Sequence, residues 1–201
     1  MAADGRNALL TIALAGNPNA GKTTLFNSLT GLKQKVANYP GVTVERKAGA
    51  WTVAGQTATL IDLPGLYSLD ATSLDEQIAR EVITGKNSSD ARPDVIVAVV
   101  DATNLERNLY LVTQILEFGI PVVVALTMID VFEKQEHEID VEMLAAMLKT
   151  PVVAVNARTG RGTDELADAV GRLVGTVPTM PFTQDEDGEE NAEIFARYNF
   201  I

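Results

Sequence analysis

A short apolar run followed at once by a glycine-rich loop constrains the fold of this chain more than any other feature. The run reads LLTIALA, and the loop (16–24) reads GNPNAGKTT. Gly16, Gly21, Lys22 and Thr23 fit the pattern GxxxxGK followed by Ser or Thr. Such glycines let successive backbone N–H groups point inward around an anion, and a helix that begins there adds the positive end of its dipole. The segment therefore predicts a phosphate-binding loop between a buried strand and a helix.

The rest of the chain alternates short apolar runs with helical patterns. The runs are rich in Val and Ile and apolar on both faces, as buried parallel strands are, and they occupy residues 9–15, 58–63, 94–102, 121–127 and 151–156. The helical patterns occupy 22–31, 74–85, 104–118, 140–149 and 163–175. Residues 46–63 predict a hairpin that feeds the sheet. This order predicts an α/β fold with a doubly wound, mostly parallel sheet and helices on both faces.

Composition limits the classes of function and divides the chain. The 201 residues carry a net charge of −11 and no cysteine, so nucleic-acid binding is disfavoured and thiol chemistry is excluded. No apolar run is long enough to cross a bilayer, so we expect no membrane insertion by this chain. We expect a main domain over 1–175, an acidic, proline-containing linker over 176–190 and the start of a helix over 191–201.

A nucleotide triphosphate is the anion that the glycine-rich loop predicts. Lys22 can supply a point charge to the outer phosphates, and the Thr23 hydroxyl can ligate Mg²⁺. Asp62, in the later segment IDLPGLYSL, can hold the same ion through water, and Gly65 can offer its N–H to the γ-phosphate with no Cβ in the way. Thr43, in NYPGVTVERK between them, can reach the γ-phosphate and Mg²⁺ from the other side.

Two further strand ends predict which base is bound. The carboxylate of Asp130, in ALTMID, can accept two hydrogen bonds from guanine, whereas adenine would leave it unpaired. The N–H of Ala157, in VNARTG, can meet the guanine O6 atom. The candidate nucleotide-binding residues are Gly16, Asn17, Asn19, Ala20, Gly21, Lys22, Thr23, Thr24, Thr43, Asp62, Gly65, Thr127, Met128, Asp130, Asn156, Ala157 and Arg158.

These motifs together resemble the GTPase superfamily and, within it, the cytoplasmic G domain of the FeoB family of prokaryotic ferrous iron transporters. The stretches that carry the resemblance are GNPNAGKTTLFNSLTG, YPGVTVERKAG, DLPGLYSL, SLDEQIAR, VVDATNLERNLYL, ALTMID and ARTGRG, within residues 10–175. The segment TNLERNLYL is not a general GTPase feature, and its periodicity alone indicates an amphipathic helix.

The resemblance implies a P-loop GTPase that converts GTP and water to GDP and phosphate. Its catalytic residues would be Asn19, Lys22, Thr43 and Gly65. The resemblance assigns Mg²⁺ to Thr23, Thr43 and Asp62, and K⁺ to Asn19. It implies as partner the membrane permease of the same full-length protein, at the cytoplasmic face of the prokaryotic inner membrane, and leaves a homo-oligomer open.

Three departures keep alternatives open. Thr127 stands where the family pattern has asparagine, so an ATPase or a dual-nucleotide enzyme is an alternative. Leu66 stands where Ras-like enzymes have a water-orienting glutamine, which predicts slow hydrolysis or a nucleotide-exchange module that barely hydrolyses. The helical domain that usually follows the G domain is expected to be missing or much reduced.

Acidic residues near these motifs are a further hypothesis. Glu45, Asp75 and Glu76 lie near the segments that contain Thr43 and Gly65 and are candidates for a transient iron contact. Their spacing does not require such a contact, and solvated charges on a loop and a helix start are the favoured interpretation.

Overall fold

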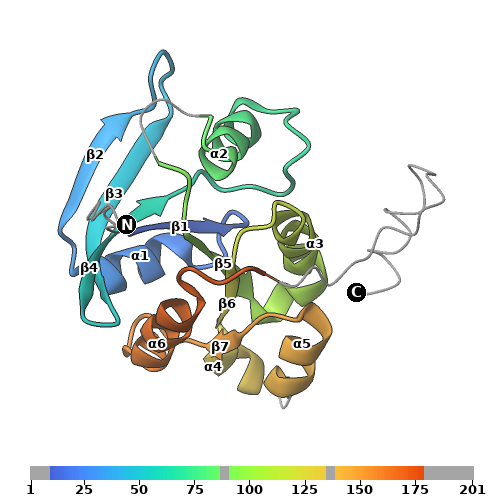
Figure 1. Cartoon of the computed structure of the whole chain (residues 1–201). Helices are drawn as coiled ribbons and strands as arrows, with labels where there is room; N and C mark the ends of the chain where they lie inside the picture. The colour runs from blue at the N-terminus through green and yellow to red at the C-terminus, as the bar shows by residue number, and fades with distance from the viewer. Residues whose placement is uncertain (1–9, 87–90, 135–138, 179–201) are drawn as a thin grey trace, which may run out of the picture.

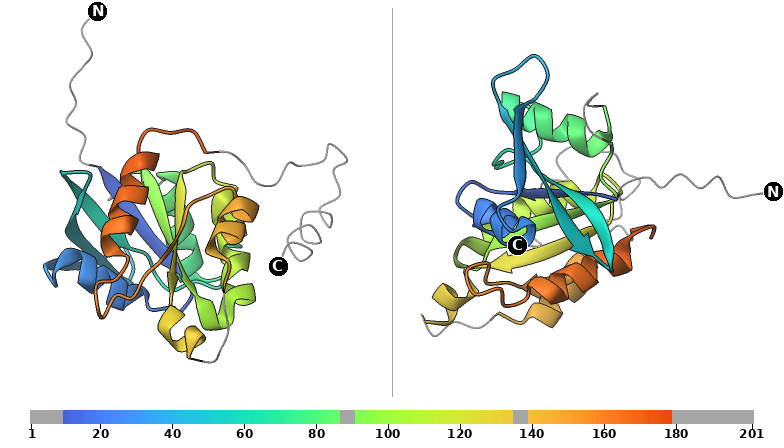
Figure 2. Two further views of the ribbon diagram at one scale, coloured as in Figure 1. Left: turned by 90° about the horizontal axis from the view of Figure 1, so that it is seen from below. Right: turned by 90° about the vertical axis from the view of Figure 1, so that its left-hand side faces the viewer.

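A computed structural model describes residues 10–86, 91–134 and 139–178, and it shows one seven-stranded sheet with helices on both faces (Figures 1 and 2). The strands are β1 (Thr11–Gly16), β2 (Gln34–Asn38), β3 (Glu45–Val53), β4 (Gln56–Asp62), β5 (Val95–Asp101), β6 (Val122–Thr127) and β7 (Val152–Ala154). Their order in the sheet is β2-β3-β4-β1-β5-β6-β7. The predicted helix start at 191–201 and most of the predicted linker lie outside the described residues.

Five strands form the parallel part of this sheet. The strand β1 pairs in parallel with β4 and β5, and β6 joins β5 and β7 in the same sense. The strand β3 pairs antiparallel with both β2 and β4. The prediction of a doubly wound, mostly parallel sheet, with a hairpin over 46–63, is confirmed.

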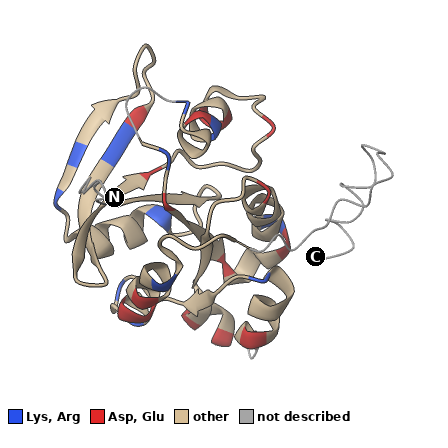
Figure 3. Ribbon diagram, viewed as in Figure 1, with Lys and Arg blue, Asp and Glu red and all other residues tan. Residues whose placement is uncertain are grey.

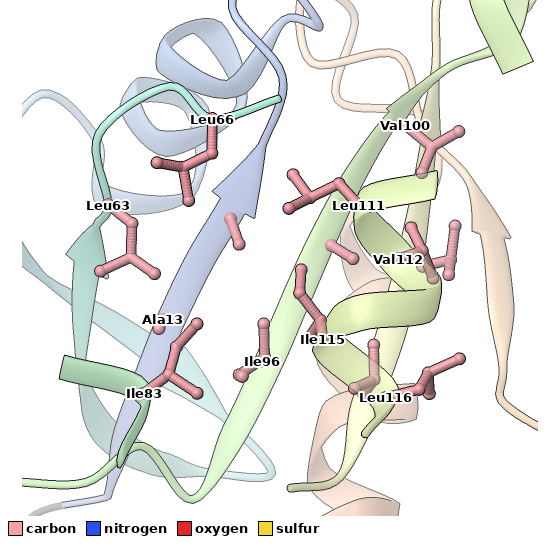
Figure 4. Close-up of a cluster of buried hydrophobic side chains, with 14 of the residues drawn as sticks. Ala13, Leu63, Leu66, Ile83, Ile96, Val100, Leu111, Val112, Ile115 and Leu116 are labelled. Carbon is pink, nitrogen blue, oxygen red and sulfur yellow. The ribbon is translucent and has the colours of Figure 1, made fainter. Parts of the chain in front are cut away.

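Alternating side chains of the buried strands divide the core into two layers. In β1, Ala13 and Ala15 face the layer shared with α2, α3 and α5, whereas Ile12 and Leu14 face the layer shared with α1 and α6. The helices are α1 (Lys22–Thr30), α2 (Leu74–Thr84), α3 (Leu105–Leu116), α4 (Ile129–Glu133), α5 (Val141–Leu148) and α6 (Thr163–Leu173). Figure 4 shows the first layer, where Leu111 and Ile115 of α3 pack near Ala13 and Ile96.

Charged side chains are not spread evenly over this fold. Lys and Arg occur on β2 and β3, although β3 also begins with Glu45. Glu142 lies on α5, and Asp164 and Glu165 lie at the start of α6 (Figure 3). Because the net charge of the chain is −11, an anion has to be held by local donors against the field of the whole molecule.

The structure contains elements that the sequence pattern did not predict. The strand β2 reads QKVAN, all five residues are exposed, and it lies at the edge of the sheet beside β3. Nothing in so polar a run marks a strand, since its formation depends on hydrogen bonds to β3 rather than on burial. The helix α4 and the short 3₁₀ turn Ala102–Asn104 were also not predicted, and β7 is shorter than the run at 151–156.

A glycine just before α6 gives a test of the backbone. Gly162 has φ +81°, and a Cβ built there would lie 2.1 Å from the carbonyl oxygen of Ala154. Gly160 has φ +78° with nothing within 4 Å of such a Cβ, so it controls for the conformation alone. We expect Gly160→Ala to cost about 1–2 kcal/mol of unfolding free energy and Gly162→Ala about 2 kcal/mol more, because a carbonyl must move.

Urea unfolding measures this difference, with the fluorescence of Trp51, the one tryptophan of the chain, as the reporter. Equal losses for the two variants would contradict the close approach of Gly162 to Ala154.

Candidate functional site

A cavity of about 390 Å³ opens at the carboxyl end of β1, against the glycine-rich loop. It is lined by Asn17, Pro18, Asn19, Gly21, Lys22, Thr23, Thr24, Gly65 and Met128. A smaller cavity of about 160 Å³ shares Asn17, Pro18 and Asn19 with it and extends toward α3. The structure thus brings together most of the predicted phosphate-loop residues and Gly65 of the segment after β4.

The loop is held in a conformation that few residue types adopt. A Cβ at Gly16 would lie 2.7 Å from the carbonyl oxygen of Val99 in β5, so the backbone approaches β5 too closely for any side chain. Asn19 and Gly21 have φ of 67° and 84°, in the left-handed region. The helix α1 begins at Lys22, and no side chain caps its first turn. Its first N–H groups therefore face the cavity without an internal acceptor.

Lys22, which lines this cavity, contacts Asp62 at the end of β4. The Nζ atom of Lys22 donates to Oδ1 of Asp62 at 2.5 Å and to the carbonyl oxygen of Leu63 at 2.5 Å. The side chains are 10% and 7% exposed, so each charge compensates the other in a mostly buried setting. The prediction that these two residues share a site is consistent with the geometry, although they lie 40 positions apart in sequence.

The residues after Asp62 pack closely against the loop. A Cβ at Gly65 would lie 3.2 Å from Cγ of Pro18, and the N–H of Leu66 donates to the carbonyl oxygen of Gly16 at 3.1 Å. The side chain of Leu66 is 1% exposed and points into the core (Figure 4). It therefore presents no polar group to the cavity, as the sequence indicated.

Thr127 connects the end of β6 to the glycine-rich loop. Its Oγ1 atom lies 2.7 Å from the carbonyl oxygen of Ala20 and 3.0 Å from that of Val100, and its single hydrogen can be donated to either. Met128, with φ 57°, follows it and lines the cavity. Asp130 lies in the first turn of α4 and is partly exposed.

The last predicted motif forms a tight turn after β7. The Oδ1 atom of Asn156 accepts from the N–H groups of Arg158 at 3.1 Å and Thr159 at 3.3 Å. This bonding fixes the turn that carries Ala157. Asp130, Asn156, Ala157 and Arg158 lie at neighbouring strand ends but do not line the cavity.

The structure does not bring Thr43 to the cavity. Asn38 of β2 pairs with Glu45 of β3, so Thr43 lies exposed in the turn of this hairpin. Buried Tyr39 anchors the turn, because its N–H donates to the carbonyl oxygen of Val44 at 3.0 Å. Figure 1 shows the hairpin extending away from the loop between β1 and α1.

Glu76 is buried, which corrects its interpretation as a solvated charge. Its carboxylate accepts hydrogen bonds from Ser68 Oγ at 2.9 Å, Thr72 Oγ1 at 2.7 Å, and the N–H groups of Thr72 and Ser73, each at 3.0 Å. The bond from the Thr72 hydroxyl, aided by the others, outweighs burial and lowers the pKa of Glu76 from 4.5 to about 2. Ser73, three positions earlier, caps α2 in return, and this capping-box pattern could have been found in the sequence.

Residues 10–86, 91–134 and 139–178 contain no group of three or more His, Cys, Asp or Glu side chains that could hold a metal ion. Within these same ranges, no helix is both long and apolar enough to pass through a lipid bilayer.

The fold and the loop first define a class of protein. A glycine-rich loop between β1 and α1, at the carboxyl edge of a doubly wound sheet, defines a P-loop nucleotide-binding domain. Within that class the chain belongs to the FeoB family, because the family model described as "Ferrous iron transport protein B" matches residues 10–170. The resemblance drawn from the motifs is confirmed.

Curated relatives support the same family. The Fe(2+) transporter FeoB of Salmonella typhimurium is 54% identical over 167 residues, which cover 81% of this chain and 21% of that protein. The Fe(2+) transporter FeoB of Escherichia coli K12 is 53% identical with the same coverage of 81% and 21%. The chain thus spans about a fifth of the length of the relatives it matches.

Solved structures extend the comparison to the fold. The G domain of T. maritima FeoB is 47% identical with a TM-score of 0.74, covering 82% of this chain and 98% of that one. The cytosolic domain of T. maritima FeoB in its GMPPNP form is 42% identical with a TM-score of 0.81, and the match covers 94% of this chain and 72% of that one. A mutant S. thermophilus NFeoB bound to GDP is 43% identical with a TM-score of 0.75, and the match covers 92% of this chain and 69% of that one.

The buried carboxylate of Glu76 gives a prediction for pH dependence. Because its pKa is lower in the folded protein, its stabilising effect is complete above pH 4.5 and is lost as the pH falls from 4.5 toward 2. We expect Glu76→Gln to cost about 1–3 kcal/mol of unfolding free energy at pH 7 and progressively less below pH 4.5.

Urea unfolding of both proteins between pH 7 and pH 3 measures this difference. The exposed neighbour gives the control, since Asp75→Asn should change stability by about 0.5 kcal/mol or less. A gap between wild type and Glu76→Gln that stays constant down to pH 3 would refute the assignment.

Proposed function

We propose that this chain is the GTP-binding, slowly GTP-hydrolysing switch domain of a ferrous iron transporter. The observation that carries the proposal is the contact of Asp62 with Lys22, a residue that lies in the first turn of α1 and lines the cavity of the glycine-rich loop. That cavity offers backbone N–H groups, an ammonium group and hydroxyls, and the carboxylate of Asp62 lies next to the ammonium group. A triphosphate with a metal ion requires this set of groups. The FeoB relatives in GDP and GMPPNP forms support the choice of nucleotide.

Phosphate binding would redistribute the partners of Lys22. Its Nζ atom is 2.5 Å from Asp62, so it exchanges a carboxylate for phosphate oxygens when the nucleotide enters. Asp62 and the exposed hydroxyl of Thr23 then become available as oxygen ligands, which suit Mg²⁺. Mg²⁺ bound there would neutralise charge on the outer phosphates. Thr43 would join these ligands only if the β2–β3 turn moves, since it lies outside the cavity.

Guanine recognition rests on Asp130 and Ala157. Asp130 would accept from the guanine N1–H and 2-amino groups, and the N–H of Ala157 would meet O6, because both follow strand ends beside the loop. The hydroxyl of Thr127 donates to a backbone carbonyl, that of either Ala20 or Val100. Threonine has no side-chain amide that could also reach the base. We therefore expect weaker nucleotide affinity than an asparagine at this position would give.

Hydrolysis would proceed without a side chain that polarises water. Leu66 is buried in the core, so backbone groups must position the attacking water. Asn19 lies exposed on the rim of the cavity and would ligate K⁺, which would stabilise charge that develops on the phosphates.

The proposed setting follows from the relatives. The 167 matched residues are 21% of the first of these relatives, which are named as Fe(2+) transporters, so the relatives are much longer than this chain. The membrane permease of the same protein is therefore the proposed partner, at the cytoplasmic face of the prokaryotic inner membrane.

Variants of Thr127 test guanine binding and its selectivity. We expect the wild-type chain, titrated in Mg²⁺ against a labelled guanine nucleotide, to bind GTP and GDP more tightly than ATP. Thr127→Asn should raise GDP affinity about tenfold, since one good hydrogen bond to the base is gained, and leave ATP unchanged. Thr127→Val keeps the shape but leaves the carbonyl of Ala20 without its donor, so affinity should fall for every nucleotide.

The competing hypothesis predicts a different pattern. Equal affinity of the wild type for GTP and ATP would favour the dual-nucleotide enzyme and contradict guanine selection by Asp130.

Phosphate release in two salts tests hydrolysis. With GTP and Mg²⁺, we expect release to be about tenfold or more faster in KCl than in NaCl. Asn19→Gly should remove this difference while GDP affinity stays within about twofold, because glycine adopts the left-handed φ of 67° without strain and the side chain that it removes is exposed. Absence of turnover in either salt, with GTP binding intact, would favour the nucleotide-exchange module instead.

A further inference from the structure

The segment TNLERNLYL (103–111) has a place in the fold that its helical periodicity did not reveal. Its leucines enter the core, as Leu109 at 5% and Leu111 at 1% exposure show. Its polar residues Asn104, Arg107 and Asn108 line the smaller cavity of about 160 Å³ instead. That cavity shares three residues of the glycine-rich loop with the larger cavity, so this part of α3 lies directly behind the proposed phosphate site.

Two side chains of α3 hold the loop that follows Gly65. The guanidinium carbon of Arg107 lies 4.1 Å from the ring centroid of Tyr67. Nearer the end of α3, the Oε1 atom of Gln114 accepts from the N–H of Leu69 at 2.8 Å, and its Nε2 atom donates to Asp70 Oδ1 at 2.8 Å. Gln114 is 4% exposed, so this second attachment is buried.

Tyr67 is the exposed part of an otherwise buried stretch. Leu66 and Leu69 on either side are 1% and 4% exposed, whereas Tyr67 is 47% exposed. About half of the Tyr67 side chain is therefore not held by packing in the core, and the contact with Arg107 holds its ring in place. Within the described part of the chain, Arg107 has no carboxylate at ion-pair distance that would compete with the ring.

We propose that Arg107 is a positioning residue for recognition of the γ-phosphate, acting through Tyr67. By holding Tyr67, Arg107 fixes the backbone two residues earlier, where Gly65 packs against Pro18 at the rim of the nucleotide cavity. A donor that is fixed before the ligand arrives needs no reorganisation when it binds. The inference rests on the proposed function, in which Gly65 meets the γ-phosphate. GDP lacks that phosphate, so its affinity should not depend on Arg107.

The ratio of two affinities measures this role. In Mg²⁺, Arg107→Ala should weaken a non-hydrolysable GTP analogue about three- to fivefold relative to GDP, the size expected for loss of one cation–π contact. Arg107→Lys should recover most of the loss, because an ammonium group can also lie over the ring. Tyr67→Ala should match Arg107→Ala, and the double variant should be no worse than either single one.

A second cation–aromatic pair provides the matched control. The guanidinium carbon of Arg80 in α2 lies 6.0 Å from the ring centroid of Phe118, and neither residue lines either cavity. Arg80→Ala should leave the ratio of the two affinities unchanged. Urea unfolding of each variant reports its stability separately.

Three outcomes would overturn the inference. An unchanged affinity ratio in Arg107→Ala would show that the contact does not position Gly65. Equal weakening of GDP and the GTP analogue, together with lower stability, would show a structural role instead. A wild-type chain that binds neither nucleotide would refute the proposed function itself, a result distinct from the other two because it appears before any variant is made.

Discussion

The register in which β1 pairs with its two parallel neighbours is the constraint on which the site depends. Leu14 pairs with Asp62 of β4, and Gly16 pairs with Val99 of β5. The first pairing ends β4 beside the glycine-rich loop, so Asp62 meets Lys22. The second presses the loop backbone onto β5, where a Cβ would come within 2.7 Å of a carbonyl oxygen. A shift by one residue would exchange the two core faces of the strand, so burial of apolar side chains also fixes the polar site.

Structure that depends on residues near each other in sequence was predicted well. Structure that depends on partners distant in sequence was not. The apolar runs and the phosphate-loop pattern are local, and both led to the observed strands and to the cavity. The strand β2 forms through pairing with β3, and this pairing places Thr43 in a hairpin turn outside the cavity. Glu76 combines both kinds of interaction. Its capping box with Ser73 is local, but its hydrogen bond from Ser68 requires the loop before α2 to fold back onto the helix.

Thr127 has a structural role, and in the proposed function it lacks the side-chain amide that would recognise the base. Its hydroxyl reaches the carbonyl of Ala20, so the glycine-rich loop stays attached to the end of β6. A hydroxyl has one hydrogen, and that hydrogen is used inside the protein. In the proposed function, selection of the base would then depend on Asp130 and Ala157. The turn that carries Ala157 is rigid without the base, because Asn156 holds it with two backbone hydrogen bonds.

The two loops that flank the cavity differ in how firmly the fold holds them. The stretch from Gly65 to Asp70 is fixed by buried leucines, by Gln114 and, through Ser68, by a carboxylate with a pKa of about 2. The β2–β3 turn depends on an edge strand whose five residues are all exposed, with Tyr39 as its buried anchor. Local opening costs least where few apolar contacts are lost. In the proposed function, a nucleotide that contacts both loops would therefore have to draw the hairpin toward the firmly held stretch. The free energy of that movement would come from the contacts that the γ-phosphate makes.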